Sequence, residues 1–384
     1  MLPMKNSLPD ATLVGRVWRP DASGASVVAI RGDRVVDLTS RHAPTMRDLM
    51  EMEDVVGYVQ TASGDDLGSL AEISKNSTEK ASWDSVHFLS PADLQVIKAS
   101  GVTFAESMVE RVIEEQAAGN ADLAQEIRVK VAGIIGESLR GIVPGSKKAM
   151  QVKQVLIDEG LWSQYLEVGI GPDAEVFTKA QPTSSVGWGA SVGLHPISSW
   201  NNPEPEIVLA VNSRGEIRGA TLGNDVNLRD VEGRSALLLG KAKDNNASCS
   251  IGPFIRVFDD GYGMEEVCRA ELTLKVEGED GFVLDGSSSM TQISRDPESI
   301  VKQTIGRHHQ YPDGFMLFLG TLFAPIQDRD DEGQGFTHKT GDVVEISEPN
   351  LGLLRNTVRL STECPEWTIG IAATMRNLAQ RGLI

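Results

Sequence analysis

Cysteine is scarce in this chain. Only Cys249, Cys268 and Cys364 occur among 384 residues, and they form no CxxC pair. Such a sparse, odd-numbered set argues against a disulfide framework and against a thiolate zinc site, and it favours a reducing compartment. We therefore expect a cytoplasmic protein that is stabilised by its core rather than by cross-links.

Long apolar segments are also missing. Residues 1–15 contain no hydrophobic stretch of the kind that a secretory signal requires. The longest apolar run, at 315–326, is too short to cross a bilayer. Neither export nor membrane insertion is expected.

Positive charge is in deficit. The chain has 36 Lys and Arg residues against 54 Asp and Glu residues, which gives a net charge of -18 at pH 7. A surface of this sign repels phosphate backbones and anionic lipid, so neither nucleic acid nor a membrane is expected as a partner. We expect a small-molecule substrate, and an anionic one would need a metal ion or a focused lysine or arginine.

The composition and length predict a globular protein with more than one domain. Hydrophobic residues make up 40% of the chain, enough for a sizeable core, and 38 glycines indicate many turns. Length alone predicts two or three domains. Around Pro91 we place a boundary between a small N-terminal α+β module (1–95) and a catalytic domain (96–384). Within the module, 26–39 predicts a β-hairpin and 44–78 a mixed helical stretch.

Beyond the module, a helical part precedes a β-rich part. Helices are predicted over 103–118, 120–140, 146–158 and 367–383. From about 175, short apolar runs alternate with Gly, Asn and Asp turns. They predict strands over 206–211, 216–222, 268–276, 314–322, 341–347 and 352–360. The predicted fold class is α+β, with a mixed, mostly antiparallel β architecture and peripheral helices.

The most informative residues are the carboxylates at 204–225. Glu204 and Glu206 are two residues apart at the start of a strand, so both side chains point to the same face. A regular hairpin turning at 212–215 places residue 206 opposite about 221 and residue 204 opposite about 223, with Asp225 just beyond. Three adjacent carboxylates favour a hard cation, Mg²⁺, Mn²⁺ or Ca²⁺. The alternative is that ExE is only a solvated strand face, which is common for so short a pattern.

Several motifs around these carboxylates recur in a known order. The segment PEPEIVLAVNSRGEIRGATLGNDVNLRD (203–230) strongly resembles the core signature of the fumarylacetoacetate hydrolase family. Further similarity covers the opening segment GVTFAESMVER (101–111), AKDNNASCSIGPF (242–254), GTLFAP (320–325) and GDVVEISEPNLGLLRNTV (341–358). The resemblance extends over roughly 100–360.

This resemblance implies a fold and a set of site residues. It implies a β-roll catalytic domain, one divalent cation, usually Mg²⁺ with Mn²⁺ as an alternative, and 2-keto acid or 1,3-diketone substrates. The implied metal ligands are Glu204, Glu206 and Asp225. Lys243 would face the substrate, and Thr321 would bind a substrate oxygen. Members of the family usually form homodimers or homotetramers.

Departures from the family pattern indicate a branch. Hydrolase members usually have a His in the opening segment, and this chain has Ser107 there, with Glu110 after it. Without an imidazole, the most suitable base for activating water near neutral pH is missing. The pair His308-His309 lies near the Gly-Thr loop in sequence and is the histidine candidate for reaching the site. The Gly-rich segment 187–193 is interpreted as a loop at the site rim, with Trp188 as a pocket wall or as core packing.

Glu175 in DAEVFTKA (173–180) points to the family's sugar-acid dehydratase branch. It resembles the position where the 2-keto-3-deoxypentonate dehydratases have a catalytic Glu, which acts with the later lysine, here Lys243. Arg111 also fits that branch, and with Ser107 and Lys179 it is a candidate substrate-binding residue. The competing interpretation is that Glu175 is a strand-edge carboxylate paired with Lys179.

The resulting hypothesis is a metal-dependent dehydratase that converts 2-keto-3-deoxypentonate to 2,5-dioxopentanoate in non-phosphorylative pentose breakdown. Glu175 and Lys243 would move the protons, and the sequence leaves open which is acid and which is base. The first alternative is a Mg²⁺-dependent hydrolase of a C–C bond in an acylpyruvate or diketo sugar acid, with water activated by Glu110. The second alternative is a binding or structural protein that keeps the fold without catalysis.

Overall fold

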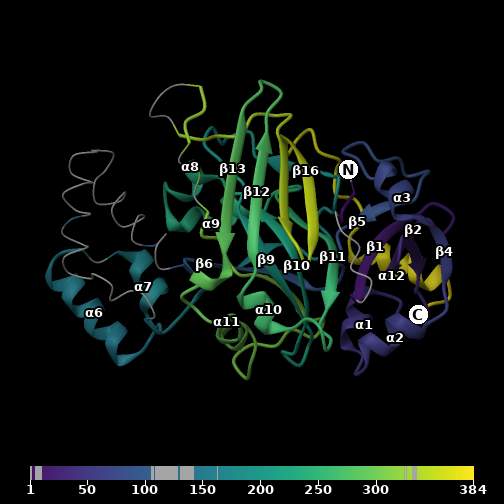
Figure 1. Ribbon diagram of the computed structural model, residues 1–384, viewed down its shortest axis with the longest axis horizontal. Coiled ribbons are helices and arrows are strands. Elements are labelled where there is room, and N and C mark those ends of the chain that lie inside the picture. The colour runs from purple at the N-terminus through teal and green to yellow at the C-terminus, as the bar shows by residue number, and fades with distance from the viewer. Residues whose placement is uncertain are drawn as a thin grey trace.

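The fold consists of two β-sheets with helices around them (Figure 1). The computed structural model describes residues 2–4, 11–104, 108, 129, 142–161, 163–323, 325, 327–330 and 335–384. The helices predicted over 103–118 and 120–140 lie almost entirely outside these residues. Within them, no helix is long and apolar enough to span a membrane. All three cysteines are free.

The larger sheet has 11 strands within the described residues, in the order β4-β3-β2-β1-β11-β10-β9-β14-β6-β7, with β5 paired to β1 outside this path. Its strands are β1 (Leu13–Arg19), β2 (Gly24–Arg31), β3 (Arg34–Asp37), β4 (Asp65–Ser69), β5 (His87–Leu89), β6 (Val96–Gly101), β7 (Glu175–Ala180), β9 (Pro205–Val211), β10 (Ile217–Asp225), β11 (Cys249–Val257) and β14 (Phe315–Phe318). Its pairs are antiparallel except for β14 with β6.

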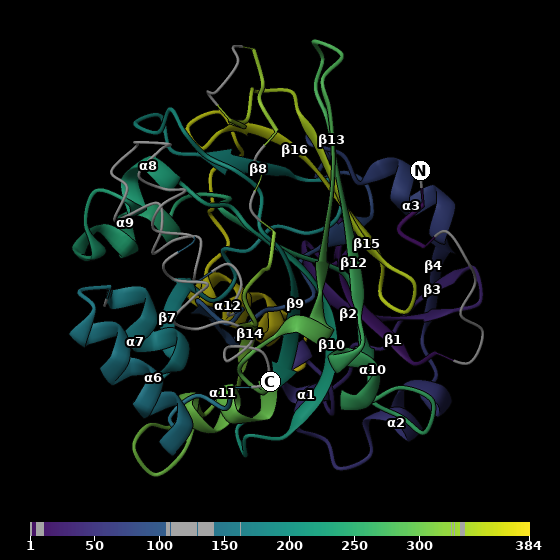
Figure 2. The ribbon, with the colours of Figure 1, turned by 60° about the vertical axis from the view of Figure 1, so that its left-hand side comes forward.

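The smaller sheet has the order β13-β12-β15-β16-β8. Its strands are β8 (Ser191–Leu194), β12 (Glu271–Glu277), β13 (Val283–Ser289), β15 (Val343–Glu348) and β16 (Gly352–Leu360). It packs against β9, β10 and β11 of the larger sheet, and Figure 2 shows the two sheets crossing. The prediction of a mixed, mostly antiparallel β architecture with peripheral helices is confirmed.

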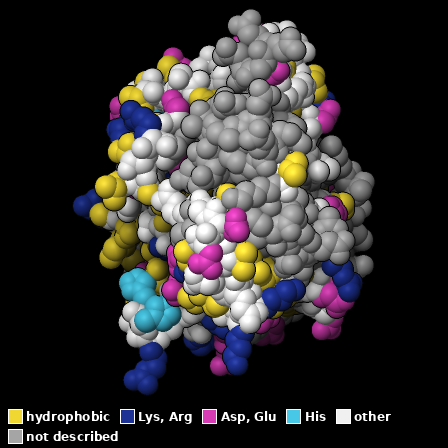
Figure 3. Space-filling model, turned by 90° about the vertical axis from the view of Figure 1, so that its left-hand side faces the viewer, with side chains coloured by type: hydrophobic (Ala, Val, Ile, Leu, Met, Phe, Trp, Pro, Cys, Tyr) yellow, Lys and Arg dark blue, Asp and Glu magenta, His cyan; other side chains and the backbone are white. Residues whose placement is uncertain are grey.

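Helices cover the outer faces and ends. They are α1 (Met46–Glu51), α2 (Val55–Thr61), α3 (Leu70–Asn76), α6 (Lys147–Asp158), α7 (Gln164–Ile170), α8 (Arg229–Glu232), α9 (Leu239–Lys243), α10 (Met264–Cys268), α11 (Pro297–Thr304) and α12 (Ile371–Gln380). The predicted helix over 146–158 corresponds to α6, and the one over 367–383 to α12. On the face shown in Figure 3, basic and acidic side chains are interspersed rather than gathered into separate patches.

Strand β9 lies at the centre because both of its faces are apolar. Ile207, Leu209 and Val211 belong to the core between the two sheets. Val208 and Ala210 point the other way, into a second core that includes residues of α1 and α2. Every residue of β9 is buried, so a carboxylate at its start is held in a rigid, low-dielectric setting.

The N-terminal residues form part of the same sheet as the rest of the chain. The predicted hairpin at 26–39 is present as β2 and β3. Strand β1 pairs with β11 as well as with β2, so the sheet continues without a break from the N-terminal strands to β9 and β10. A domain boundary near residue 95 stays a prediction.

Candidate metal and catalytic site

Three carboxylates meet at one end of the β9–β10 hairpin. Glu204 precedes β9, Glu206 is its second residue, and Asp225 ends β10. One oxygen of each lies within 4.8 Å of the others. The predicted proximity of these three side chains is confirmed, and two of them are buried rather than on a solvated strand face.

The predicted pairing of the hairpin is wrong by two residues. Glu206 lies opposite Gly223, not 221, and the backbone N–H of Asp225 donates to the carbonyl of Glu204 at 3.1 Å. The turn takes five residues, 212–216, and a bulge at 218 adds another to the returning strand. Because the shift is an even number of residues, the faces are unchanged, and Asp225 lies directly across from Glu204.

Two of the carboxylates accept hydrogen bonds from residues that are not part of the carboxylate group. The backbone N–H of Gly320 donates to Glu206 Oε2 at 2.6 Å. Asn227 Nδ2 donates to Glu204 Oε1 at 2.9 Å. Neither Gly320 nor Asn227 was singled out from the sequence, although both lie inside quoted motifs, GTLFAP and NDVNLRD. Their place inside these motifs was the only indication in the sequence. Gly320 acts through its backbone N–H, so it has no side chain that a sequence pattern could point to.

Burial and mutual repulsion perturb the pKa of each carboxylate. Burial raises the pKa of Glu206 well above its usual range, and the charges of Asp225 and Glu204 raise it further. Burial also raises the pKa of Glu204, against the pull of Lys243. For Asp225, burial is outweighed by Lys179 and Lys243, so its pKa is lowered. The group therefore holds more negative charge than its surroundings balance, which favours binding of a cation.

The donor set fits a hard divalent cation. Among the described residues, the group of potential ligands consists of Glu204, Glu206 and Asp225, with no His or Cys in it. Carboxylate oxygens are the ligands that Mg²⁺ and Mn²⁺ prefer, and a set of three leaves positions for water and substrate. The side chain of Glu206 has no ion-pair partner within the described residues, so it has capacity for a metal.

Lys243 ends α9 and points into the carboxylate group. Its Nζ lies 2.9 Å from Glu204 Oε2, 3.1 Å from Asp225 Oδ2 and 3.8 Å from Glu232 Oε2. Burial acts to lower the pKa of Lys243, but Asp225, Glu204 and Glu232 outweigh it and raise the pKa well above its usual value. In this setting Lys243 is an ammonium cation, and it is placed to donate a hydrogen bond and to stabilise negative charge.

Lys179 is enclosed completely. Its side chain is 0% exposed, and its Nζ lies 2.8 Å from Asp225 Oδ1 and 2.6 Å from the carbonyl of Lys243. These contacts fix Asp225 and the end of α9 at the same time. The placement argues for a supporting role rather than for the predicted contact with substrate.

Replacing Lys179 should therefore destabilise the protein. Lys179→Met leaves the carboxylate of Asp225 buried with only Lys243 as its cation, and we expect a loss of about 3–5 kcal/mol of unfolding free energy. Lys98→Met is the matched control, because Lys98 is also largely buried and, within the described residues, its side chain bonds only the hydroxyl of Thr178 at 3.1 Å. Urea denaturation of both variants measures the difference, and equal small losses would contradict the role given to Lys179.

Glu175 begins β7 beside the end of β6. It lies opposite Gly101, where an added Cβ would come within 2.1 Å of Glu175 Oε2, so the absence of a side chain at Gly101 makes room for the carboxylate. Burial first, and then the charge of Glu232, raises the pKa of Glu175 to about 7, against the opposing effect of Lys243. A carboxyl group with this pKa is available in both protonation states near neutral pH.

The competing interpretation of Glu175 gains no support. Within the described residues, Lys179 pairs with Asp225, and no ion pair joins it to Glu175. Glu232 on α8 was missed by the sequence analysis, although it lies only two residues after the NDVNLRD motif. Its contact with Lys243 is made by a four-residue helix whose position depends on the tertiary structure.

The remaining predicted residues have different outcomes. Thr321 directly follows Gly320 and is half-buried, and its Oγ1 accepts from the N–H of Phe323 at 3.1 Å. Ser107, Glu110 and Arg111 lie outside the described residues, so their roles stay predictions. The suggestion that His308-His309 reaches the site is wrong, because this exposed pair precedes the start of β14, whereas Gly320 follows its end.

Comparison with known proteins agrees with this geometry. Residues 171–359 match the family model described as fumarylacetoacetate (FAA) hydrolase C-terminal, and the carboxylates, Lys179 and Lys243 all lie within this region. This match assigns residues 171–359 to the fumarylacetoacetate hydrolase family.

Two relatives of this chain have dehydratase names. The probable 2-keto-3-deoxyxylonate dehydratase of Haloferax volcanii is 32% identical over 194 residues, which cover 50% of this chain and 63% of the relative. The 2-dehydro-3-deoxy-D-arabinonate dehydratase of Saccharolobus solfataricus is 32% identical over 185 residues, 48% of this chain and 58% of the relative. The chain thus matches less than two thirds of the length of either relative.

A solved structure shares the fold of this chain. It is a 2-keto-3-deoxy-D-arabinonate dehydratase complexed with magnesium and 2,5-dioxopentanoate. The match has a TM-score of 0.62 at 22% identity and covers 91% of this chain and 99% of that chain. The expectation of the family's fold is confirmed.

Proposed function

We propose that the protein is a hydro-lyase that removes water from 2-keto-3-deoxypentonate to give 2,5-dioxopentanoate. The observation that carries this proposal is Glu175, with a pKa of about 7, in the electrostatic field of Lys243 and of three clustered carboxylates. Elimination of water needs one group that accepts a proton from carbon and releases it to a leaving hydroxyl, and a carboxyl group with this pKa does both. The two dehydratase relatives support the same reaction class.

Glu204, Glu206 and Asp225 would hold the metal. A bound Mg²⁺ would supply Lewis acidity that polarises the 2-keto group and makes the C3 proton easier to remove. The chain itself provides the charge that keeps these ligands in place, because Lys179 and Lys243 both contact Asp225.

The proton transfers are assigned to Glu175. As a carboxylate it accepts a proton from C3, and as the acid it donates that proton to the C4 hydroxyl, which leaves as water. Lys243 is cationic in this setting, so we assign it the stabilisation of negative charge on the substrate oxygens rather than the role of base. Loss of a proton from C5 and return of one to C3 then give an enol at C4–C5. This enol takes a proton at C4 and releases its hydroxyl proton, which gives the C5 aldehyde of the product.

Product analysis tests the proposal directly. Purified protein with Mg²⁺ is given 2-keto-3-deoxypentonate in one reaction and an acylpyruvate in another, each with an EDTA control. We expect 2,5-dioxopentanoate from the first reaction only, and none of it with EDTA. Pyruvate from the second reaction alone would contradict the dehydratase and would establish the hydrolase alternative, with Glu110 as the base.

A further inference from the structure

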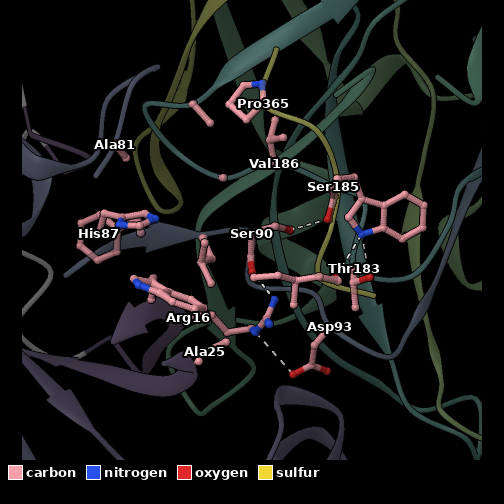
Figure 4. A pocket seen from close by; sticks show the side chains of 18 of the residues that line it. Arg16, Ala25, Ala81, His87, Ser90, Asp93, Thr183, Ser185, Val186 and Pro365 are labelled. Atoms are coloured by element: carbon pink, nitrogen blue, oxygen red, sulfur yellow. Dashed lines mark hydrogen bonds and ion pairs between the residues drawn. The ribbon is translucent and has the colours of Figure 1, made fainter. Parts of the chain in front are cut away.

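A cavity lies apart from the carboxylate site. Its volume is about 400 Å³, in the range of small-molecule sites. It is lined by β1 and β2, the segments 77–93 and 183–191, and the C-terminal segment 365–378 (Figure 4). None of the three carboxylates, Glu175 or Lys243 lines it. Trp188, which the sequence suggested as a wall of the carboxylate site, lines this cavity.

A buried arginine lies in the wall of this cavity. The side chain of Arg16 is 9% exposed and its Nη1 donates to the carbonyls of Ser90, at 3.1 Å, and Ala92. Its Nε lies 3.5 Å from Asp93 Oδ2, as the dashed line in Figure 4 shows. Within the described part of the chain, Nη2 of Arg16 makes no hydrogen bond.

Asp93, the carboxylate paired with Arg16, also accepts hydrogen bonds from the backbone. The carboxylate of Asp93 accepts backbone N–H groups from Met46 at 2.6 Å, Arg47 at 3.1 Å and Leu94 at 2.7 Å, two of them in the first turn of α1. An arginine stays protonated at any physiological pH. Arg16 and Asp93 therefore form a buried ion pair with one contact at 3.5 Å, and within the described residues the guanidinium keeps Nη2 for a further acceptor.

A second donor in the cavity wall also lacks a partner. The indole Nε1 of Trp188 is buried and has no hydrogen-bond partner in the described part of the chain, and Trp188 is 5% exposed. The backbone beside it is in direct contact with the chain at Leu89 and Ser90, because a Cβ on Gly187 would meet these two residues at 2.4–2.6 Å. Arg16 also bonds Ser90, so both donors are anchored at the same segment. Because Nε1 of Trp188 is sealed from solvent, the donor that a ligand in the cavity can reach is Nη2 of Arg16, and it favours a ligand that accepts hydrogen bonds.

Aromatic side chains form part of the wall, among small and polar residues. Trp18 and Trp83 pack edge to face, with centroids 4.7 Å apart, and His87 packs against Trp83. Burial lowers the pKa of His87, so its ring is neutral at pH 7. Trp367, whose Nε1 donates to Thr183 Oγ1 at 3.2 Å, belongs to the C-terminal segment of the wall. Trp83 and Trp367 are 51% and 45% exposed, an unusual exposure for indoles and one that a flat ligand would reduce.

We propose that this cavity is a binding site for a small organic carboxylate with a flat apolar group. The carboxylate lies against Arg16, and the apolar group lies among the tryptophans. On a chain with a net charge of -18, Nη2 of Arg16 offers an organic carboxylate a charge-assisted hydrogen bond in this wall. The opposing charges are those of Asp93, which is paired with Arg16, of Glu79, which is paired with Arg359, and of Glu366. The site is independent of the proposed dehydratase reaction.

Phenylacetate is a suitable probe, because it combines one carboxylate with one flat ring. Titration calorimetry of the full chain in EDTA should show saturable binding at millimolar concentration. The neutral isostere phenylacetamide should bind roughly tenfold more weakly or worse, because it cannot form the charge-assisted pair with arginine. Absence of saturable phenylacetate binding, or equal affinity for both compounds, would overturn the proposal.

Two kinds of variant locate the binding. Arg16→Gln removes the charge and should weaken phenylacetate binding at least tenfold, with circular dichroism as the check on folding. Ala373→Phe fills the cavity from α12 without touching Arg16 and should abolish binding. Ala372→Phe is its matched control, since Ala372 is exposed on the same helix and does not line the cavity. Binding that survives Ala373→Phe lies elsewhere, for example at the carboxylate site, and would also overturn the proposal.

Discussion

Glu204→Gln should abolish cation-dependent turnover and leave the fold intact. The change removes one of three adjacent charges but keeps an oxygen that can accept from Asn227 Nδ2. Lys243 keeps its contact with Asp225 at 3.1 Å. A catalytic metal contributes several kcal/mol of transition-state stabilisation, so we expect a loss on the order of 10³-fold in kcat. Steady-state rates at saturating Mg²⁺ measure this loss, and calorimetry measures the loss of Mg²⁺ binding.

A residue of the same hairpin provides the matched control for this loss. Glu216 lies at the turn end of the hairpin, paired with Arg214 at 2.8 Å and half exposed. Glu216→Gln removes the same charge from the same pair of strands and should change neither Mg²⁺ binding nor kcat. Full activity of the unmodified protein in EDTA would contradict the metal site altogether, and so would undiminished Mg²⁺ binding by Glu204→Gln.

Glu175→Gln should separate metal binding from chemistry. Because Glu175 is not one of the three clustered carboxylates, the variant should keep Mg²⁺ binding and lose about 10²- to 10⁴-fold in kcat, the usual contribution of a general acid–base group. In the unmodified protein, kcat should rise with pH through about 7, where Glu175 becomes the carboxylate that accepts the C3 proton. That rise should be absent from the residual activity of the variant. Normal turnover by the variant would contradict the role of Glu175.

Stability in EDTA gives an independent measure of the same pKa. The pKa of Glu175 is about 7 in the folded protein against an ordinary 4.5, so the folded state binds this proton more tightly than the unfolded state. Stability from this group is therefore greatest at low pH and is lost as the pH rises from about 4.5 to 7. We expect Glu175→Gln to be more stable than the unmodified protein at pH 8, with a difference that disappears below pH 5.

Gly101→Ala tests the position of Glu175 without altering its chemistry. A methyl group at residue 101 would lie 2.1 Å from Glu175 Oε2, so the carboxylate has to move. A displacement of this size should lower kcat by about 10- to 100-fold with Mg²⁺ binding unchanged. If Gly101→Ala is fully active, the carboxylate does not need its observed position.

Local patterns in the sequence were enough to identify the clustered carboxylates, but not to predict which residues of β9 and β10 pair with each other. The spacing of Glu204 and Glu206 placed both on one face, and the structure shows them there. The strand pairing depended on the turn length and on the bulge at 218, and neither has a clear signal in the residues. The longer turn and the bulge each shift the pairing by one residue. Their sum is two residues, so the side chains remain on the predicted faces.

Residues whose role depends on distant parts of the chain were harder to assign. Lys179 was expected to contact substrate, and only its enclosure against Asp225 and the end of α9 shows a supporting role. Glu232 reaches Lys243 from a helix too short to be recognised by periodicity. The pairing of β1 with β11 joins residues about 240 positions apart, and nothing in either strand specifies the other.

That long-range pairing has a consequence for how the protein is made. Translation produces β1 and β2 early, and β5 can cover β1 at Arg16–Trp18, but Leu13 and Val14 wait for Arg256 and Ile255. Until about two thirds of the chain has emerged from the ribosome, this part of β1 is an open sheet edge, which can pair with other chains. The same dependence on distant contacts slows folding in general. We therefore expect nascent chains that stall before residue 257 to be the aggregation-prone species, and yield in expression to depend on chaperones that bind them.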